Sequence, residues 1–242
     1  MIYITGDLHG DINSVRGSNI MNTLKTLTED DFLIVTGDFG YIWNNAYTPK
    51  ETRILNNLRH TVNNATILFV DGNHENFERL YNLPTVEMFG NEVGIANDGI
   101  YWLKRGNIYN IENNKIFTFG GAASIDKMWR KNRISWWEEE IPNSEEVNRA
   151  YETINTAEQI DYIITHTCPD RIKNKFPNWK LDGGFECPVQ KMLDYIDEVS
   201  MKRFPNLKWY FGHFHWNQNI DDRYNLLYEK VLKLGENVVD AD

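Results

Sequence analysis

Five of the six histidines in this chain lie in short motifs that also contain Gly, Asp or Asn, and each motif follows a segment typical of a β-strand. The motifs are Gly6-Asp7-Leu8-His9-Gly10, Gly72-Asn73-His74-Glu75, Thr165-His166-Thr167-Cys168-Pro169 and Gly212-His213-Phe214-His215. A further segment, Gly37-Asp38-Phe39-Gly40, contributes a carboxylate without a histidine. Carboxylate, amide and imidazole groups that recur after successive strands form a set of metal ligands, and this set predicts a hydrolytic site for two metal ions.

The elements that must position these motifs are short apolar strands. Each motif directly follows one of them, over residues 1–5, 32–36, 67–70, 162–165 and 209–211. Continuous apolar runs such as FLIVT are typical of strands that are covered on both faces. In open α/β sheets ligands bind at the carboxyl ends of the strands, so five strands can bring their side chains to one edge. We expect tight backbone turns at the glycines of these motifs, Gly6, Gly37, Gly72 and Gly212.

The rest of the chain predicts helices around these strands and an antiparallel portion in the middle. Helices are expected over residues 12–27, 49–58, 76–81, 143–158 and 188–204. The fourth begins with Asn143 and Glu146, a pattern similar to a capping box. Further strands are expected over residues 100–103, 107–111, 115–119 and 226–234, with a hairpin turn at 112–114. No repeat or linker interrupts the pattern, so we expect a single α/β domain over residues 1–242, with two sheets and flanking helices.

The composition describes an acidic chain with few cysteines. The formal net charge of -10 argues against a broad basic surface for long nucleic acid. It leaves room for a small anionic substrate, because bound metal ions reverse the local field. The two cysteines are too few for a disulfide framework, and no secretory leader pattern or bilayer-spanning apolar run is evident. We therefore expect a cytoplasmic protein with no membrane partner, and the oligomeric state stays open.

The ligand types narrow the choice of metal. Asp, Asn and neutral His offer oxygen and nitrogen atoms, which suit Mn, Fe, Zn or Ni better than Cu(I) or an iron–sulfur cluster. Each motif alone is weak, since an isolated Asp-x-His is more often a turn or a helix cap. The remaining histidine, His60, lies near a predicted helix end and is interpreted as a partner of the helix dipole.

The ordered set of motifs resembles the calcineurin-like metallophosphoesterases, whose pattern is Asp-x-His, Gly-Asp, Gly-Asn-His, His and Gly-His-x-His. All five motifs occur here in that order, from residue 6 to residue 215. The resemblance implies a four-layer αββα sandwich of two mixed β-sheets flanked by helices. It also implies a metal-dependent phosphoric ester hydrolase with two divalent transition-metal ions, Mn before Fe, Zn or Ni, which share the attacking hydroxide.

The resemblance further implies a role for each motif residue. Seven ligands are implied, in two groups that share one carboxylate: Asp7, His9 and His215 for the first metal, Asn73, His166 and His213 for the second, and Asp38 for both. His74 would not bind metal but would protonate the leaving oxygen or stabilise charge there. Asp38 and His74 are therefore the candidate catalytic residues.

One departure from the pattern bears on the substrate. Similar protein serine/threonine phosphatases continue the second motif with Asp-Arg-Gly, whereas here Asp38 is followed by Phe39-Gly40. The absence of that arginine argues against protein phosphatase activity. Three other arginines are candidates for binding the substrate phosphate: Arg79, Arg130 and Arg133. For Arg79 a salt bridge with Glu75, four residues earlier, is an equal alternative.

The expected substrate is a small phosphate ester or a nucleotide, either a monoester or a diester. The alternatives are a protein phosphatase-like enzyme, a nuclease of the same superfamily, and a partner-binding scaffold that has lost its metal. A scaffold would lack ligands, and a nuclease would need a basic groove. The Trp136-Trp137 pair either stacks on a nucleobase or packs into the core.

Overall fold

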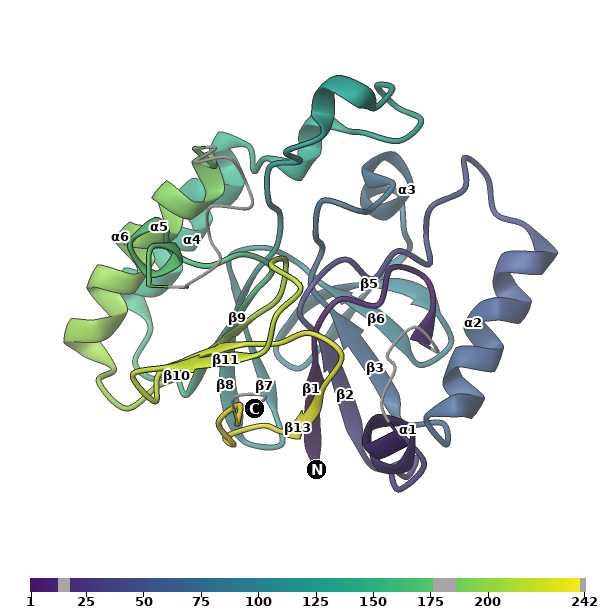
Figure 1. The fold of residues 1–242 in the computed structure, drawn as a ribbon, viewed down its shortest axis with the longest axis horizontal. Helices are drawn as coiled ribbons and strands as arrows, with labels where there is room; N and C mark the ends of the chain where they lie inside the picture. Colours follow the sequence, from purple (N-terminus) through teal and green to yellow (C-terminus); the bar gives the residue numbers. More distant parts are fainter. Residues whose placement is uncertain (13–17, 176–185, 240–242) are drawn as a thin grey trace.

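A computed structural model describes residues 1–12, 18–175 and 186–239, which form two mixed β-sheets with helices on their outer faces (Figure 1). In order across sheet A, the described strands are β13 (Val231–Lys233), β1 (Ile2–Thr5), β2 (Phe32–Val35), β3 (Thr66–Phe69), β6 (Ile100–Leu103), β5 (Asn91–Asn97) and β4 (Thr85–Met88). Across sheet B they are β11 (Gln218–Ile220), β12 (Tyr224–Leu226), β10 (Lys208–Phe211), β9 (Tyr162–Thr165), β8 (Asn114–Phe119) and β7 (Asn107–Ile111).

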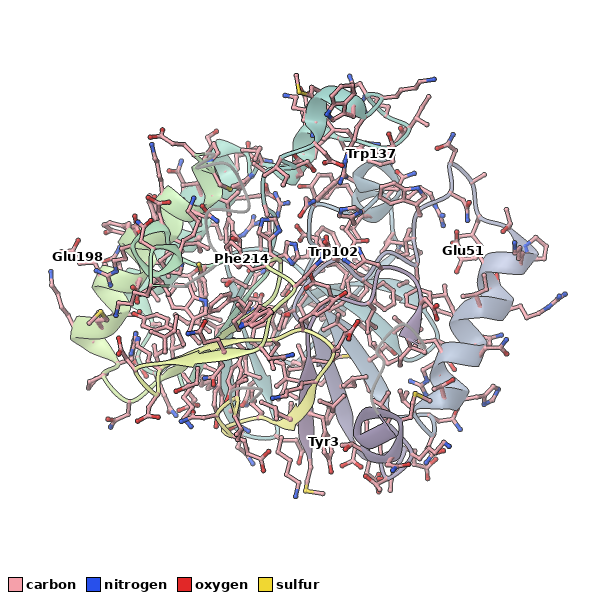
Figure 2. The ribbon with its side chains drawn as sticks, in the orientation of Figure 1. Tyr3, Glu51, Trp102, Trp137, Glu198 and Phe214 are labelled. Atoms are coloured by element: carbon pink, nitrogen blue, oxygen red, sulfur yellow. The ribbon has the colours of Figure 1, made fainter. Side chains whose placement is uncertain are left out.

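The helices cover the two sheets from opposite sides. Those beside sheet A are α1 (Ser18–Leu24), α2 (Pro49–Thr61) and α3 (Phe77–Tyr81). Those beside sheet B are α4 (Ser144–Thr156), α5 (Asp170–Lys173) and α6 (Pro188–Arg203). In Figure 2, Glu51 on α2 and Glu198 on α6 mark the two outer helical layers. The expected α/β sandwich of two mixed sheets flanked by helices is confirmed.

The apolar strands lie in the interior of the molecule, with both of their faces buried. In β2, Leu33 and Val35 pack toward the helices beside sheet A, whereas Ile34 lies in the apolar layer between the sheets. In β9, Ile163 packs toward the helices beside sheet B and Ile164 joins the same central layer. Since side chains alternate along a strand, a strand covered on both faces needs the continuous apolar run that the sequence shows.

Parallel pairing brings the strand ends to one edge. Strands β1, β2 and β3 are neighbours and run parallel, and so do β9 and β10 in the other sheet. The five segments that follow them carry the histidine and aspartate motifs. The carboxyl ends of the strands therefore deliver these motifs as the sequence predicted.

Helix starts agree with the local sequence. Helix α4 begins with a complete capping box, in which Asn143 accepts from the backbone of Glu146 and the Glu146 side chain accepts from the backbone of Asn143. Helix α2 begins at Pro49, with the Thr48 side chain capping it. Both predicted starts are confirmed.

Some elements differ from the prediction. The helix expected over residues 12–27 is described only as α1, and residues 13–17 of that prediction lie outside the described residues. The strand expected over 226–234 is confirmed over Val231–Lys233 (β13), whereas Leu226 ends a separate strand of the other sheet, β12. The β4–β5 hairpin was not predicted; in it Glu87 and Glu92 face each other, and most of β4 is exposed.

Candidate metal centre

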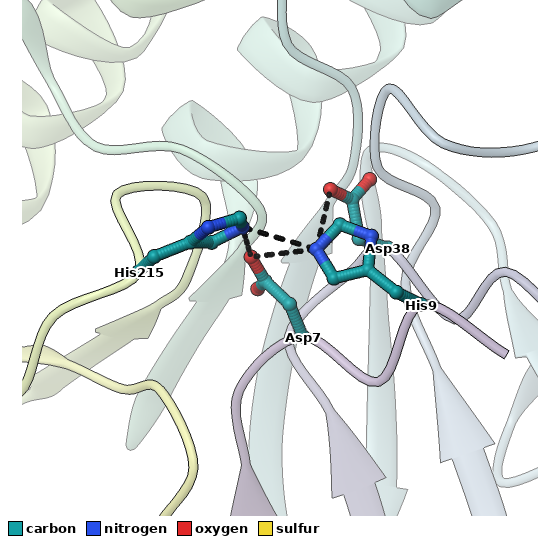
Figure 3. Close-up of side chains that lie close together, drawn as sticks. All are labelled: Asp7, His9, Asp38 and His215. Carbon is teal, nitrogen blue, oxygen red and sulfur yellow. Dashed lines mark hydrogen bonds and ion pairs between the residues drawn. The ribbon is translucent and has the colours of Figure 1, made fainter. Parts of the chain in front are cut away.

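The motif side chains meet between the carboxyl ends of the two sheets. The first donor group consists of Asp7, His9, Asp38 and His215, whose ligand atoms all lie within 4.8 Å of one another (Figure 3). His9 Nε2 lies 3.0 Å from His215 Nε2, and Asp7 Oδ2 lies 3.3 Å from the latter. Both imidazoles are partly open to solvent, with 30% and 49% of their side-chain surface exposed. Two buried carboxylates and two partly exposed imidazoles thus converge at one place.

The second donor group consists of Asn73, Asp38, His166 and His213. His166 Nε2 lies 3.2 Å from Asn73 Oδ1 and 3.4 Å from Asp38 Oδ1. The rings of His166 and His213 meet edge to face with centroids 4.9 Å apart. The two donor groups share Asp38, because its other oxygen, Oδ2, lies 3.8 Å from His9 Nε2.

The hydrogen bonds of His166 indicate whether the second donor group suits a cation. Its Nδ1 lies 3.0 Å from the carbonyl oxygen of Thr36, which can only accept, so Nδ1 carries the hydrogen of the neutral ring. Nε2 then directs its lone pair at the oxygens of Asn73 and Asp38. Three acceptors that face one another need a positive charge between them, either a proton or a metal ion. The donor set therefore fits a divalent cation.

The pKa values of the two buried histidines follow the same logic. Burial by itself would lower the pKa of His166, but the carboxylates of Asp38 and Asp7 outweigh it and raise this pKa to about 9. Burial and repulsion from His166 lower the pKa of His213 to about 3. The centre thus attracts one positive charge at His166 and keeps His213 as a neutral nitrogen donor.

Four residues of the centre have the left-handed backbone conformation, which residues other than glycine rarely adopt. His9, Asp38, His213 and His215 have φ angles of 48°, 45°, 71° and 51°. Each such conformation costs on the order of 1–3 kcal/mol and persists only where the surroundings enforce it. Here the backbone N–H groups of Leu8 and His9 donate to the carbonyl of Asp38, which locks the first two motif loops together.

The glycines of the motifs allow close approach more than they allow unusual φ angles. A Cβ added at Gly72 would lie 2.1 Å from Asp38 Oδ1, and one added at Gly212 would lie 2.0 Å from Asp7 Oδ1. Neither of these glycines has a left-handed φ. At these two positions the missing side chain leaves room for a carboxylate of the neighbouring motif. The chain also turns tightly at Gly212, where the N–H of Phe214 donates to the Gly212 carbonyl at 2.9 Å.

His74 lies beside the donor groups and contacts an arginine. Arg130 Nη2 lies 2.8 Å from His74 Nε2, and since a guanidinium can only donate, this nitrogen accepts. The His74 ring packs edge to face on His9 with centroids 4.8 Å apart, and its backbone N–H donates to Asp38 Oδ1. Burial lowers the pKa of His74, Asp38 opposes this, and Arg130 adds to it. His74 is thus a neutral ring beside a fixed positive charge.

Residues 1–217 of the 242 match the family model of the calcineurin-like phosphoesterases, a range that spans all five motifs. This chain belongs to the calcineurin-like phosphoesterase family. As a member of that family it is a metal-dependent phosphoric ester hydrolase. A comparison with curated proteins finds no match. In the part of the chain that the structure describes, no helix has the length and apolar character needed to cross a membrane.

Of the three candidate phosphate-binding arginines in this calcineurin-like chain, only Arg130 contacts a residue of the centre. Arg79 forms a bidentate ion pair with Glu51, with nitrogen–oxygen distances of 2.6 and 2.7 Å. The alternative partner expected for Arg79, Glu75, instead accepts from the backbone N–H groups of Phe39 and Gly40. Arg133 lies 3.3 Å from Glu139 with half of its side chain exposed.

The tryptophan pair divides between two environments. Trp137 is buried and packs edge to face on Trp43, with ring centroids 5.4 Å apart, so the packing alternative is correct for this residue. Trp136 is partly exposed and lies under the ammonium group of Lys127, 4.0 Å from the ring centroid. Trp43 in turn stacks on His74 at 6.1 Å, which makes it an apolar wall of the centre.

Two residues near the centre were missed by sequence reasoning. Ser124 accepts a hydrogen bond from Asn73 Nδ2 at 3.3 Å, and its hydroxyl lies 2.5 Å from Glu140 Oε2. The only signal for Ser124 was its place at the end of a Gly-Gly-Ala-Ala turn after a strand. Glu140 is the last of three consecutive acidic residues in the sequence and is only 2% exposed.

Proposed function

We propose that this calcineurin-like phosphoesterase hydrolyses phosphate monoesters or diesters with a pair of divalent cations held by the two donor groups. Asp7, His9 and His215 would hold the first cation, Asn73, His166 and His213 the second, and Asp38 both. The observation that carries the proposal is the orientation of Asp38, whose two oxygens face different histidines, His9 and His166. A carboxylate shared between two donor groups is the usual bridge of a two-metal site.

The cation pair, when bound, polarises the phosphate and lowers the pKa of water so that it attacks near neutral pH. The chain's own residues supply the remaining charges. Two buried carboxylates, Asp7 and Asp38, offset part of the cation charge. The rings of His9 and His215 are partly exposed, so the first donor group is open to substrate.

His74 and Arg130 would act together on the phosphate and the leaving oxygen. Arg130 donates to His74 Nε2, which leaves the ring hydrogen on Nδ1. Both groups can therefore donate hydrogen bonds where negative charge develops, and such donors stabilise a transition state strongly. Arg130 would also replace the arginine that the second motif loop lacks. Arg79 and Arg133 pair with Glu51 and Glu139, away from the centre, and are weaker candidates for this role.

The substrate we propose is a small phosphate ester or a nucleotide. The net charge of -10 disfavours a long polyanion, while a single fixed positive charge at Arg130 suits one phosphate group. The oxygen and nitrogen donors suit Mn, Fe, Zn or Ni, and of these we propose Mn as the metal. We also propose one domain over residues 1–242 in a reducing, cytoplasmic setting, because one apolar layer joins the sheets and both cysteines are buried free thiols.

The test measures metal content and turnover together. The purified protein is assayed with added Mn on p-nitrophenyl phosphate, its bis ester and single-stranded DNA. His74→Ala is expected to lower kcat by about 10²–10⁴-fold while two metal ions stay bound. His60→Ala, on α2, is the matched control and should leave both quantities unchanged.

Each result has a definite meaning. Loss of metal in His74→Ala would show that His74 is a ligand and that the assigned role is wrong. Two bound metals without turnover of any ester would favour the scaffold alternative. Turnover of single-stranded DNA above the small esters would favour the nuclease.

A further inference from the structure

The side-chain amide of Asn73 can serve as a metal ligand in only one of its two orientations. The oxygen Oδ1 carries lone pairs that can bind a cation, whereas the Nδ2 group only donates hydrogen bonds. The two ends of the amide have nearly the same shape, so packing alone does not choose between them. A hydrogen-bond acceptor placed on the Nδ2 side is needed to hold Oδ1 toward the cation.

Ser124 is that acceptor, and Glu140 determines its direction. Asn73 Nδ2 donates to Ser124 Oγ at 3.3 Å, while Oδ1 lies 3.2 Å from His166 Nε2 on the opposite side. Glu140 accepts from Ser124 twice, from the backbone N–H at 2.8 Å and from the hydroxyl at 2.5 Å. Because the hydroxyl hydrogen is directed at Glu140, the lone pairs of Ser124 Oγ point to Asn73.

Glu140, Ser124 and Asn73 form a hydrogen-bond relay that is enclosed, so water does not replace its hydrogen bonds. Ser124 and Glu140 are 3% and 2% exposed, and Asn73 is 7% exposed. Burial raises the pKa of Glu140, and the two hydrogen bonds from Ser124 oppose that rise by favouring the carboxylate. A buried carboxylate that accepts two donors from one residue fixes that residue tightly.

We propose that Ser124 and Glu140 are positioning residues, which hold the Asn73 amide with Oδ1 toward the second cation. The same pair joins the two ends of the segment 125–139, which carries Arg130 to His74. One carboxylate thus fixes both a ligand of the centre and the base of the segment that carries the phosphate-binding arginine. This inference rests on the proposed function, because it requires Asn73 to bind a metal ion.

The first test compares Ser124→Ala with Ser200→Ala. Both variants remove a buried serine hydroxyl, but Ser200 lies on α6, where its hydroxyl donates to the carbonyl of Asp197. Mn binding to the apoprotein is measured by isothermal titration calorimetry, and the Tm of the apoprotein is measured separately. Ser124→Ala should weaken one of the two Mn sites by about 10–100-fold and leave the other unchanged. Ser200→Ala should keep both Mn affinities.

The second test uses Glu140→Gln, which keeps the shape but changes the donors. The backbone N–H of Ser124 cannot turn, so the Gln oxygen pairs with it and the Gln NH₂ group donates to Ser124 Oγ. The hydroxyl hydrogen then turns toward Asn73 and favours the flipped amide. The same single Mn site should weaken by about 10–100-fold, and Ser124→Thr, which keeps the hydroxyl, should retain the affinity of the unaltered protein.

Three outcomes would overturn the inference. Ser124→Ala and Glu140→Gln could both bind two Mn ions with unaltered affinity, so that the relay has no effect on Asn73. Alternatively, both Mn sites could weaken together with a loss in Tm beyond that of Ser200→Ala, which marks a merely structural role. If the unaltered protein binds fewer than two Mn ions, the proposed function fails first and this inference fails with it.

Discussion

Arg130 differs from the other candidate arginines in what its guanidinium group touches. It contacts His74 Nε2 and pairs with Asp126 at 2.7 Å, so it is held in place beside the centre. Arg133 belongs to the same segment but reaches Glu139 and Glu78 at the surface. Residue type alone made the two arginines equivalent, and their contacts separate them.

Replacing these two arginines tests that difference. Arg130→Ala is expected to lower kcat/KM by about 10²–10³-fold, because it removes a fixed donor beside the phosphate. Arg133→Ala should change kcat/KM by less than about twofold, since an exposed ion pair contributes little. Steady-state kinetics at saturating Mn measures both. Equal effects of the two substitutions would contradict the assignment of Arg130.

His166 makes the centre sensitive to pH. Its folded pKa of about 9 lies above the unfolded value of about 6.5, so the apoprotein gains stability that is fully present below pH 6.5 and is lost as pH rises through 9. If His166 holds a cation as proposed, metal binding displaces the same proton, so Mn affinity should rise over this window. His213, with its pKa of about 3, stays neutral throughout the window.

The measurement is the Tm with and without Mn between pH 6.5 and 9. The apoprotein Tm should fall with rising pH while the increase in Tm caused by Mn should grow. His166→Ala should remove most of both trends. A Mn-dependent increase in Tm that stays constant across the window would show that no proton leaves when the metal binds.

At the scale of elements, the centre depends on how closely the motif loops approach one another. The loop after β1 and the loop after β2 share backbone hydrogen bonds, and the backbone N–H of His213, after β10, donates to both oxygens of Asp7 at 3.1 Å. The loops of both sheets are thus joined through carboxylates. Glycine is required where a strand end passes against such a carboxylate.

Gly212→Ala tests that close approach. The added Cβ would lie 2.0 Å from Asp7 Oδ1, so the loop or the carboxylate must move. We expect a loss of about 1–3 kcal/mol in the free energy of unfolding, together with weaker Mn binding. Gly90→Ala is the comparison, since its Cβ would meet no atom within 4 Å and only its φ of 87° is strained. Urea unfolding and Mn titration follow both, and unaltered Mn binding in Gly212→Ala would contradict the argument.

At the scale of the whole molecule, one buried ion network joins the two halves of the fold. Arg105, between β6 of sheet A and β7 of sheet B, lies 2.6 Å from Asp71 and 3.0 Å from Glu146 on α4. Asp71 also accepts from Trp102 Nε1 at 3.0 Å and directly precedes the Gly72-Asn73-His74 motif. Trp102 lies near the middle of the molecule in Figure 2.

Arg105→Ala should therefore destabilise the whole fold. Removing the cation leaves Asp71 as a fully buried carboxylate without its partner, which costs about 3–5 kcal/mol in such sites. Urea unfolding followed by fluorescence measures the loss. Lys202→Ala, which breaks an exposed pair with Glu198, is the control and should cost less than about 1 kcal/mol. Similar losses in the two variants would show that the network is not structural.

The sequence by itself determined the donor types, their order along the chain and the apolar strands that precede them. These features are local, since a strand covered on both faces must be apolar and a metal ligand must carry a lone pair. The same local logic predicted the start of α4 from Asn143 and Glu146. It placed the final strand within 226–234, where β13 lies, but it did not show that the chain passes from one sheet to the other between β12 and β13, because no residue pattern records that change.

The tertiary structure alone decided which groups meet. In the folded chain Arg130 contacts His74 and Arg79 forms an ion pair with Glu51, although both arginines carry the same charge. The tertiary structure also buried Glu140, which the sequence presented as one of three consecutive acidic residues, and directed it through Ser124 to Asn73. Such partners are far apart in the sequence, and their meeting depends on how the two sheets and the segments between them pack, which is a property of the whole chain and not of any window of it.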